Sequence, residues 1–284
     1  MLAINTHYPT HQAMRLLFHV AAVVWLVTEG FSAVGLGVLA VTYLLGILSV
    51  TVGYHRYFSH RSFETHRLTQ FLLGVAGCCQ LQGGPIAWTA VHRHHHRHSD
   101  DDDDLHSPVH GLFHSHVGWL SRPRTYEVAF SDVRDLSRYK ELVWLDHLNF
   151  VPPLLCFGAL WGAGAAYQAS VPGSIVDGPF LLFWGGIIRV VVVWHFTWSV
   201  NSICHRWGST PFETGDTSKN NLWVALFTCG EGWHNNHHRY PSSARNGLKW
   251  SEPDLAFLVI RALDLAGLVW AVRRPNGQTG SIGR

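Results

Sequence analysis

The sequence is poor in charged residues. Asp, Glu, Lys and Arg make up 14% of its 284 residues, well below the roughly 25% of an average soluble protein. Hydrophobic residues make up 47% of the chain, so the balance is that of a membrane protein. The net charge is only +2, and nothing in it indicates a nucleic-acid partner.

Several cysteine and glycine patterns are also missing. The five cysteines form no Cys-x-x-Cys pair, which argues against a disulfide framework and a zinc finger. The sequence carries no haem-type domain, no cysteine set for an iron–sulfur cluster and no Gly-rich dinucleotide motif. Any redox chemistry would therefore draw its electrons from a separate protein. The N-terminus shows no clear signal peptide, and we interpret its first apolar run as a retained membrane segment.

Long apolar runs are present instead. A helix that spans a bilayer needs about 20 apolar residues. We predict transmembrane helices at residues 12–28, 31–54, 148–169 and 179–203, the first two joined by a turn at Glu29–Gly30. The fold class expected is an all-α integral membrane protein, with two helical hairpins and a single domain over residues 1–284.

Residues 68–91 decide the sidedness of the histidine-rich segments. This run is uncharged but contains three glutamines and Gly83-Gly84-Pro85, so we predict an interfacial or re-entrant helix rather than a span. All histidine-rich segments then lie on one face, with every Lys and Arg except Arg189, and the positive-inside rule makes that face cytoplasmic. Residues 92–147 and 206–273 would form a helical cytosolic cap, and the tail 274–284 is expected to be disordered.

Histidine is in large excess, with 21 residues. Helical neighbours three and four apart share one face, so His92, His95 and His96 can present three imidazoles together, and so can the triplet His234, His237 and His238. Adjacent residues point about 100° apart, so neighbouring histidines can serve two metals. The pair His55 and His60 is five apart and does not share a helical face, but it can still converge if the helix ends between the two residues. Asn201 and His205 form a fourth element.

The ligand type narrows the chemistry. Neutral imidazole is a common metal ligand and suits Zn, Cu, Fe or Ni. A carboxylate-type di-iron site needs two Glu-x-x-His pairs, and only Glu231–His234 has that spacing. A divalent-metal transporter is the alternative of another class, but transporters place such residues near the bilayer midplane. Isolated histidines are interpreted as core or surface residues. They are His7, His11, His19, His66, His106, His110, His114, His147 and His195. His94 and His98 break the cluster spacing and are interpreted as residues behind the ligands or at the surface.

The chain resembles the membrane fatty acid desaturases, in particular bacterial and plant-like members of the stearoyl-CoA (Δ9) branch. The matching patterns are HxxxxH at 55–60, HxxHH at 92–96, NxxxH at 201–205 and HNxHH at 234–238. The resemblance implies two iron ions with histidine ligands and no other catalytic residues. One iron would take His55, His60, His92, His96 and His237; the other would take His95, His205, His234 and His238, with a water held by Asn201.

The implied reaction uses dioxygen and two external electrons to place a cis double bond in a saturated acyl chain. The chain would be carried on CoA, a lipid or acyl carrier protein, and the donor would be of ferredoxin, rubredoxin or cytochrome type. A membrane di-iron hydroxylase or ketolase is the closer alternative. The Arg-Asp pair that contacts CoA in the animal enzymes is replaced here by Ala90 and Val91.

Four further residues are candidates for supporting roles. Arg122 and Arg124 could hold a phosphate-bearing headgroup, or anchor the chain at the interface by snorkelling. Within the acidic run Asp100–Asp104, one or two carboxylates could accept hydrogen bonds from ligating imidazoles. Asp104 and Glu231 are the candidates for that role.

Overall fold

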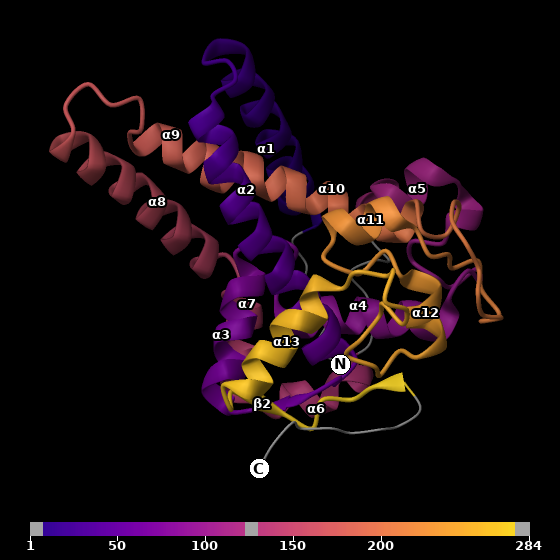
Figure 1. Cartoon of the computed structure of the whole chain (residues 1–284). Helices are drawn as coiled ribbons and strands as arrows, with labels where there is room; N and C mark the ends of the chain where they lie inside the picture. The colour runs from indigo at the N-terminus through magenta and orange to yellow at the C-terminus, as the bar shows by residue number, and fades with distance from the viewer. Residues whose placement is uncertain (1–7, 123–129, 276–284) are drawn as a thin grey trace.

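The computed structural model describes residues 8–122 and 130–275, and nearly all the regular structure in them is helical (Figure 1). The first hairpin pairs α1 (Tyr8–Thr28) with α2 (Ala33–Leu48). Gly30 takes a left-handed φ of 74° in the turn, which glycine adopts without strain. Ser32 then caps α2 by accepting a hydrogen bond from the Gly35 amide.

The second hairpin pairs α8 (Val151–Ser170) with a composite helix. That helix consists of α9 (Gly178–Leu182), the π-helix η6 (Phe183–Ile188) and α10 (Arg189–Ser202). By length and composition, three helices could cross a membrane: His11–Thr28, Ala33–Ser59 and Gly178–His205. A fourth span is counted only if α7 (Lys140–His147) and α8 are taken as one helix bent by 68°.

The second helix does not end near residue 54 as predicted. It continues as the π-helix η1 (Ser49–Ser59), and the His60 amide donates to the His55 carbonyl at 3.2 Å. A π-helix bonds residue i to i+5, so residues five apart lie one turn above one another. The helix ends at Ser59 and His60 is its C-cap, so it does end between His55 and His60, as their convergence was expected to need. The wide π-turn before that end also brings the two residues together.

The predicted helix over 68–91 is two helices. They are α3 (Arg67–Cys78) and α4 (Pro85–His98), with Gly84 as the residue before α4. Asp146 of α7 accepts from the Ile86 and Ala87 amides, each at 3.0 Å, and so caps α4 from another element. The prediction of one continuous helix was wrong because this cap comes from a distant part of the chain.

Short elements make up the part of the molecule that corresponds to the predicted cap, and we call this part the cap below. Figure 1 shows α4, α12 and α13 grouped at the end of the molecule opposite the loop between α8 and α9. The two short strands β1 (Glu64–Thr65) and β2 (Val269–Trp270) pair antiparallel. The predicted tail 274–284 lies outside the described residues from position 276 onward. The remaining cap helices are η2 (Pro108–His110), α5 (Leu112–His116), η3 (Gly118–Ser121), η5 (Phe130–Val133), α6 (Arg134–Ser137), α11 (Leu222–Phe227), α12 (His234–Arg239) and α13 (Leu255–Leu265).

A buried arginine ties the second helix to the cap. Arg56 is 1% exposed and its guanidinium lies 3.0 Å from Glu231 and 2.9 Å from Asp254. It also donates to the Ala244 carbonyl at 2.7 Å. Because a buried charge is costly unless it is paired and hydrogen-bonded, these three partners fix η1 against the segments that flank α12 and α13.

Candidate metal centre

Five histidines from three elements form one cluster. His55 comes from η1 and His60 follows it, His92 and His96 come from α4, and His237 comes from α12. We call this the five-histidine cluster. One ring nitrogen of each lies within 4.8 Å of the others. The Nε2–Nε2 distances are 2.7 Å for His60–His92, 3.1 Å for His92–His96, 3.0 Å for His96–His237 and 3.1 Å for His55–His237.

Four more histidines form a second cluster. His95 comes from α4, His205 follows α10, and His234 and His238 come from α12. We call this the four-histidine cluster, and its ring nitrogens also lie within 4.8 Å of one another. His234 Nε2 is 3.0 Å from both His205 Nε2 and His238 Nε2. The structure therefore gathers the nine histidines into the same two groups that the resemblance implies.

The spacing of the ring nitrogens suits a metal ion. Two ligands at right angles, each about 2.1 Å from an ion, lie about 3.0 Å apart. The four-histidine cluster also contains a buried orphan, since His95 Nε2 has no hydrogen-bond partner among the described residues. A bound ion would satisfy this nitrogen. The donor set therefore fits a first-row transition metal in each cluster, and that ligand role remains a prediction.

Burial keeps several of the clustered imidazoles neutral. Burial lowers the pKa values of His60, His92 and His96 well below 6.5, and neighbouring imidazoles lower them further. Burial likewise lowers the pKa of His238 to about 4, although Asp216 opposes the shift. Metal binding requires the deprotonated ring, so this environment holds the rings in the competent form at neutral pH.

Carboxylates lie behind several of the rings. His95 Nδ1 is 3.0 Å from Asp104, His205 Nδ1 is 3.2 Å from Asp100, His238 Nδ1 is 2.6 Å from Asp216 and His55 Nδ1 is 2.5 Å from Glu231. Such contacts fix the tautomer and aim Nε2 at the metal position. Asp104 and Glu231 were the predicted candidates. Asp216 was not, because it follows His205 by 11 residues in a loop with no spacing that marks it.

The charges of these carboxylates are stabilised inside the protein. Burial raises the pKa of Asp104, but the nearby His106 and His95 outweigh it and the pKa falls below its usual value. Burial also raises the pKa of Glu231, and the positive fields and hydrogen bonds of His55 and Arg56 lower it overall. Both groups therefore stay ionised and accept hydrogen bonds at neutral pH.

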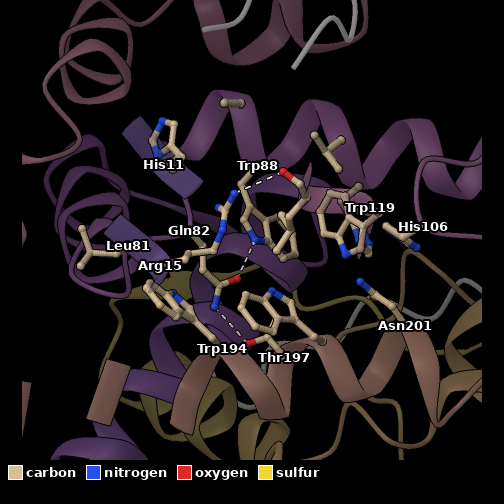
Figure 2. Close-up of a pocket in the computed structure, with 16 residues that line it drawn as sticks. His11, Arg15, Leu81, Gln82, Trp88, His106, Trp119, Trp194, Thr197 and Asn201 are labelled. Atoms are coloured by element: carbon tan, nitrogen blue, oxygen red, sulfur yellow. Dashed lines mark hydrogen bonds between the residues drawn. The ribbon is translucent and has the colours of Figure 1, made fainter. Parts of the chain in front are cut away.

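An apolar pocket, drawn in Figure 2, reaches the five-histidine cluster. His92 lines it, and so does Asn201, which precedes His205 by four residues. Inside the pocket, Gln82 donates to Thr197 at 3.1 Å and accepts from Trp88 at 3.2 Å, as the dashed lines in Figure 2 mark. The apolar lining is Leu81, Ala87, Trp88, Val91, Trp119, Leu120, Trp194 and Trp198.

The predicted headgroup residues do not line this pocket. Arg122 is exposed, and Arg124 lies outside the described residues. His11 and Arg15 from α1 are the basic residues in the lining (Figure 2). His106 also lines the pocket, and its ring centroid is 4.3 Å from that of His95.

Two histidines interpreted as isolated, His19 and His195, instead form a hydrogen-bonded series with His116. His195 is bonded at 3.0 Å to both His19 and His116, and His116 is 2.9 Å from the Ser202 hydroxyl. These three hydrogen-bonded histidines join α1, α10 and α5. No sequence spacing links residues so far apart, so the single-residue interpretation missed it.

Comparison with known proteins places the chain in a family. A family model described as fatty acid desaturase matches residues 29–272. A hex-5-enoyl-[acyl-carrier protein] acetylenase from Moorena producens (strain JHB) is 34% identical over 96% of this chain and 87% of its own length. An sn-2 palmitoyl-lipid 9-desaturase from Nostoc sp. (strain 36) is 37% identical over 93% and 90%. An acyl-CoA C20 Delta5-desaturase from Anemone leveillei is 32% identical over 82% and 72%. The chain belongs to the fatty acid desaturase family of oxygen-dependent oxidoreductases.

Proposed function

We propose that this protein is an O2-dependent desaturase that introduces a cis double bond, at the Δ9 position, into a saturated acyl chain. The observation that carries the proposal is the apolar pocket against the five-histidine cluster, with His92 and Asn201 in its lining and the four-histidine cluster on the same helices α4 and α12. An apolar slot beside two metal positions suits a substrate of methylene groups.

The nine clustered histidines would hold two iron ions, five around one and four around the other. Iron bound there would supply the chemistry that reduces dioxygen with two external electrons and removes two hydrogens from adjacent methylenes. The residues of the chain do the rest: the carboxylates orient the imidazoles, and Asn201 would hold a water at the four-histidine cluster. Product formation also consumes two protons, so that one alkane segment, dioxygen, two electrons and two protons give one alkene and two waters.

The pocket would select the reacting position. The Gln82–Thr197–Trp88 bonds cross its wall and place a fixed polar point among the tryptophans. A chain held against that point in a dry slot can present only one pair of methylenes to the metals. The same slot excludes water from the reacting carbons.

We propose an acyl chain esterified to a membrane lipid as the substrate to test first. Ala90, which stands in place of the arginine of the animal enzymes, is fully buried, so this position offers no cation to CoA. The Nostoc relative is named as a palmitoyl-lipid desaturase. The proposed topology has four spans, counting α7 and α8 as one, with the clusters on the cytoplasmic side. A separate ferredoxin, rubredoxin or cytochrome-type protein would supply the electrons.

Expression in a desaturase-deficient host tests the proposal. The lipids are analysed by mass spectrometry after the double bonds have been tagged chemically, which reports both the product and its position. Extracts supplied with acyl-lipid, acyl-CoA or acyl carrier protein substrates, each with an electron donor, separate the carriers. New cis-monounsaturated chains are expected. A hydroxylated chain would move the protein to the hydroxylase alternative, and no new chain with any donor would refute the proposal.

A further inference from the structure

The short helix α11 presents an apolar face that no described part of the chain covers. Its inner residues Val224 and Ala225 are buried. Its outer face is fully apolar and includes Trp223, which is 69% exposed. The four exposed side chains are Leu222, Trp223, Leu226 and Phe227.

The contacts of α11 place its C-terminal end beside the middle of α2. The Tyr43 hydroxyl of α2 donates to the Phe227 carbonyl at 2.5 Å. Phe196 of α10 stacks on the Phe227 ring with centroids 4.8 Å apart. Tyr43 follows the first residue of α2, Ala33, by ten positions, or about 15 Å along the axis. That is about half of a 30 Å hydrocarbon core, so an α2 that spans the bilayer holds the end of α11 within it.

Three backbone carbonyls at this end of α11 are hydrogen-bonded within the protein. The Val224 carbonyl accepts from the Thr228 amide at 2.8 Å and from the Thr228 hydroxyl at 2.6 Å. The Ala225 carbonyl accepts from the Gly230 amide at 2.8 Å, and the Phe227 carbonyl accepts from Tyr43. Helix ends in hydrocarbon need such internal partners because unsatisfied carbonyls are costly there. At a water-exposed end, solvent would serve.

We propose that α11 is inserted into the bilayer from the cap side, with Leu222, Trp223, Leu226 and Phe227 facing lipid tails. The lipid surface is favoured as the occupant because this face is continuous with the two spans that α11 contacts through Tyr43 and Phe196. The inference rests on α2 spanning the membrane, as in the proposed function. It also has a structural consequence: Glu231, which lies behind His55, follows α11 by only four residues. The depth of α11 therefore sets the depth of the metal centre.

Site-directed spin labelling tests the insertion. Full-length protein is reconstituted in lipid vesicles, and nitroxide labels are placed by Trp223→Cys and, separately, Leu226→Cys. The unsubstituted protein, labelled alike, gives the background from the native cysteines. Val41→Cys on α2, where the side chain is 63% exposed, is the lipid reference, and Glu213→Cys on an exposed cap loop is the water reference. Each label is probed with oxygen, which concentrates in lipid, and with a water-soluble nickel chelate.

Insertion predicts that oxygen collisions exceed nickel collisions at 223 and 226, as at 41, and that the order reverses at 213. A reversed order at 223 and 226 would place α11 in water and overturn the proposal. Low collision rates with both probes would mean that protein, such as a second copy of the chain, covers the face, and would overturn it too. If position 41 itself reads as water, the spanning placement of α2 fails, which separates failure of the proposed topology from failure of the insertion.

Discussion

The two histidine clusters have the same spacing of ring nitrogens but different surroundings. Among the residues that the structure describes, the five-histidine cluster has one carboxylate behind it, Glu231 at His55. The four-histidine cluster has three, at His95, His205 and His238. A carboxylate behind a ring makes the imidazole a stronger donor. The four-histidine cluster therefore has fewer ligands, but more of its rings have a carboxylate behind them.

This difference separates two ways to hold a metal. Five imidazoles can bind an ion because there are many ligand nitrogens, and they leave few coordination positions free. Four imidazoles with carboxylates behind them can bind an ion because each nitrogen is a stronger donor, and they leave a position free for a further ligand. Asn201 lines the pocket and precedes His205 by four residues, so the freer position would face the side from which substrate enters. The comparison predicts that the clusters fail independently and for different reasons.

Loss of one ligand from each cluster should give the largest effect. The neighbours His95 and His96 lie on one helix but belong to different clusters. We expect His95→Ala and His96→Ala each to lower iron from two ions per chain to one. Turnover should fall by more than about 100-fold, since partners behind the ligands alone are worth 10–100-fold. Metal analysis and product formation measure both effects. Loss of both ions from one variant and neither from the other would contradict the division into two clusters.

Removal of the carboxylate behind the five-histidine cluster should be the next largest effect. Glu231→Gln takes a support from His55 and one of two carboxylates from buried Arg56. We expect a stability loss of about 2 kcal/mol, because a buried charge is left partly unpaired, together with weaker iron binding. Thermal unfolding in detergent and iron retention report the two effects. The matched control is Asp254→Asn, which also unbalances Arg56 but touches no histidine; it should lower stability and leave iron bound.

Single carboxylates behind the four-histidine cluster should have a smaller and more local effect. We expect Asp216→Asn or Asp100→Asn to weaken iron binding at this cluster by about 10–100-fold, with little change in stability because neither carboxylate pairs with a buried arginine. Chelator competition on each variant measures the affinity. Equal losses from both clusters would show that the carboxylates act on the whole centre and not on the ring that each contacts.

Helical spacing predicted part of this centre from sequence alone. The pairs His92–His96 and His234–His238, four apart, each share a cluster as helical spacing predicts, and the split of adjacent His95 and His96 follows from the 100° step. The third member of each triplet, His95 or His237, lies in the other cluster, so the prediction that each triplet presents three imidazoles together was wrong. The helix end between His55 and His60 was expected, but the π-helix before it was not, because a π-helix is set by tertiary packing and not by a local pattern. Asp216 carried no pattern at all, since a loop carboxylate becomes a partner of His238 only when the chain is folded.

The apolar segments show the same limit. Hydropathy located both hairpins, because a run of about 20 apolar residues is a local property. It merged α3 and α4 into one helix, although Gly83-Gly84-Pro85 was visible in the sequence. The break became certain only with Asp146, a residue 60 positions after Ile86 whose carboxylate caps α4.

Removal of the pocket-side amide should be milder than any loss behind the rings. Asn201 is predicted to hold a water and not to bind iron itself. We expect Asn201→Ala to keep both ions and to lower turnover by about tenfold, the worth of one hydrogen bond of roughly 1.4 kcal/mol. Iron content and turnover are measured on the same preparation. Loss of iron from the four-histidine cluster would instead make Asn201 part of the ligand set.

The smallest expected difference between the two clusters is in their response to low pH. The unfolded pKa of histidine is about 6.5, and burial lowers the folded value for His238 only to about 4, because Asp216 favours the charged ring. For His60, His92 and His96 the pKa lies well lower, with no such carboxylate among the causes. Between pH 6.5 and 4 the unfolded chain therefore binds protons that the folded clusters do not bind. As the pH falls through this range, the metal-free protein should lose about 1.4 kcal/mol of stability per pH unit for each such histidine.

The same ordering predicts which metal leaves first. Protons compete with metal for the ring nitrogens, and His238 is the clustered ring that Asp216 makes easier to protonate, so the four-histidine cluster should release its ion at a higher pH than the five-histidine cluster. The single-site variants His95→Ala and His96→Ala, each expected to keep one ion in the other cluster, allow the two acid titrations to be followed separately by metal analysis after dialysis. Earlier release from the five-histidine cluster would mean that ligand number, and not the carboxylates behind the rings, sets acid resistance. In that case the carboxylates of the four-histidine cluster strengthen its donors without making them easier to protonate.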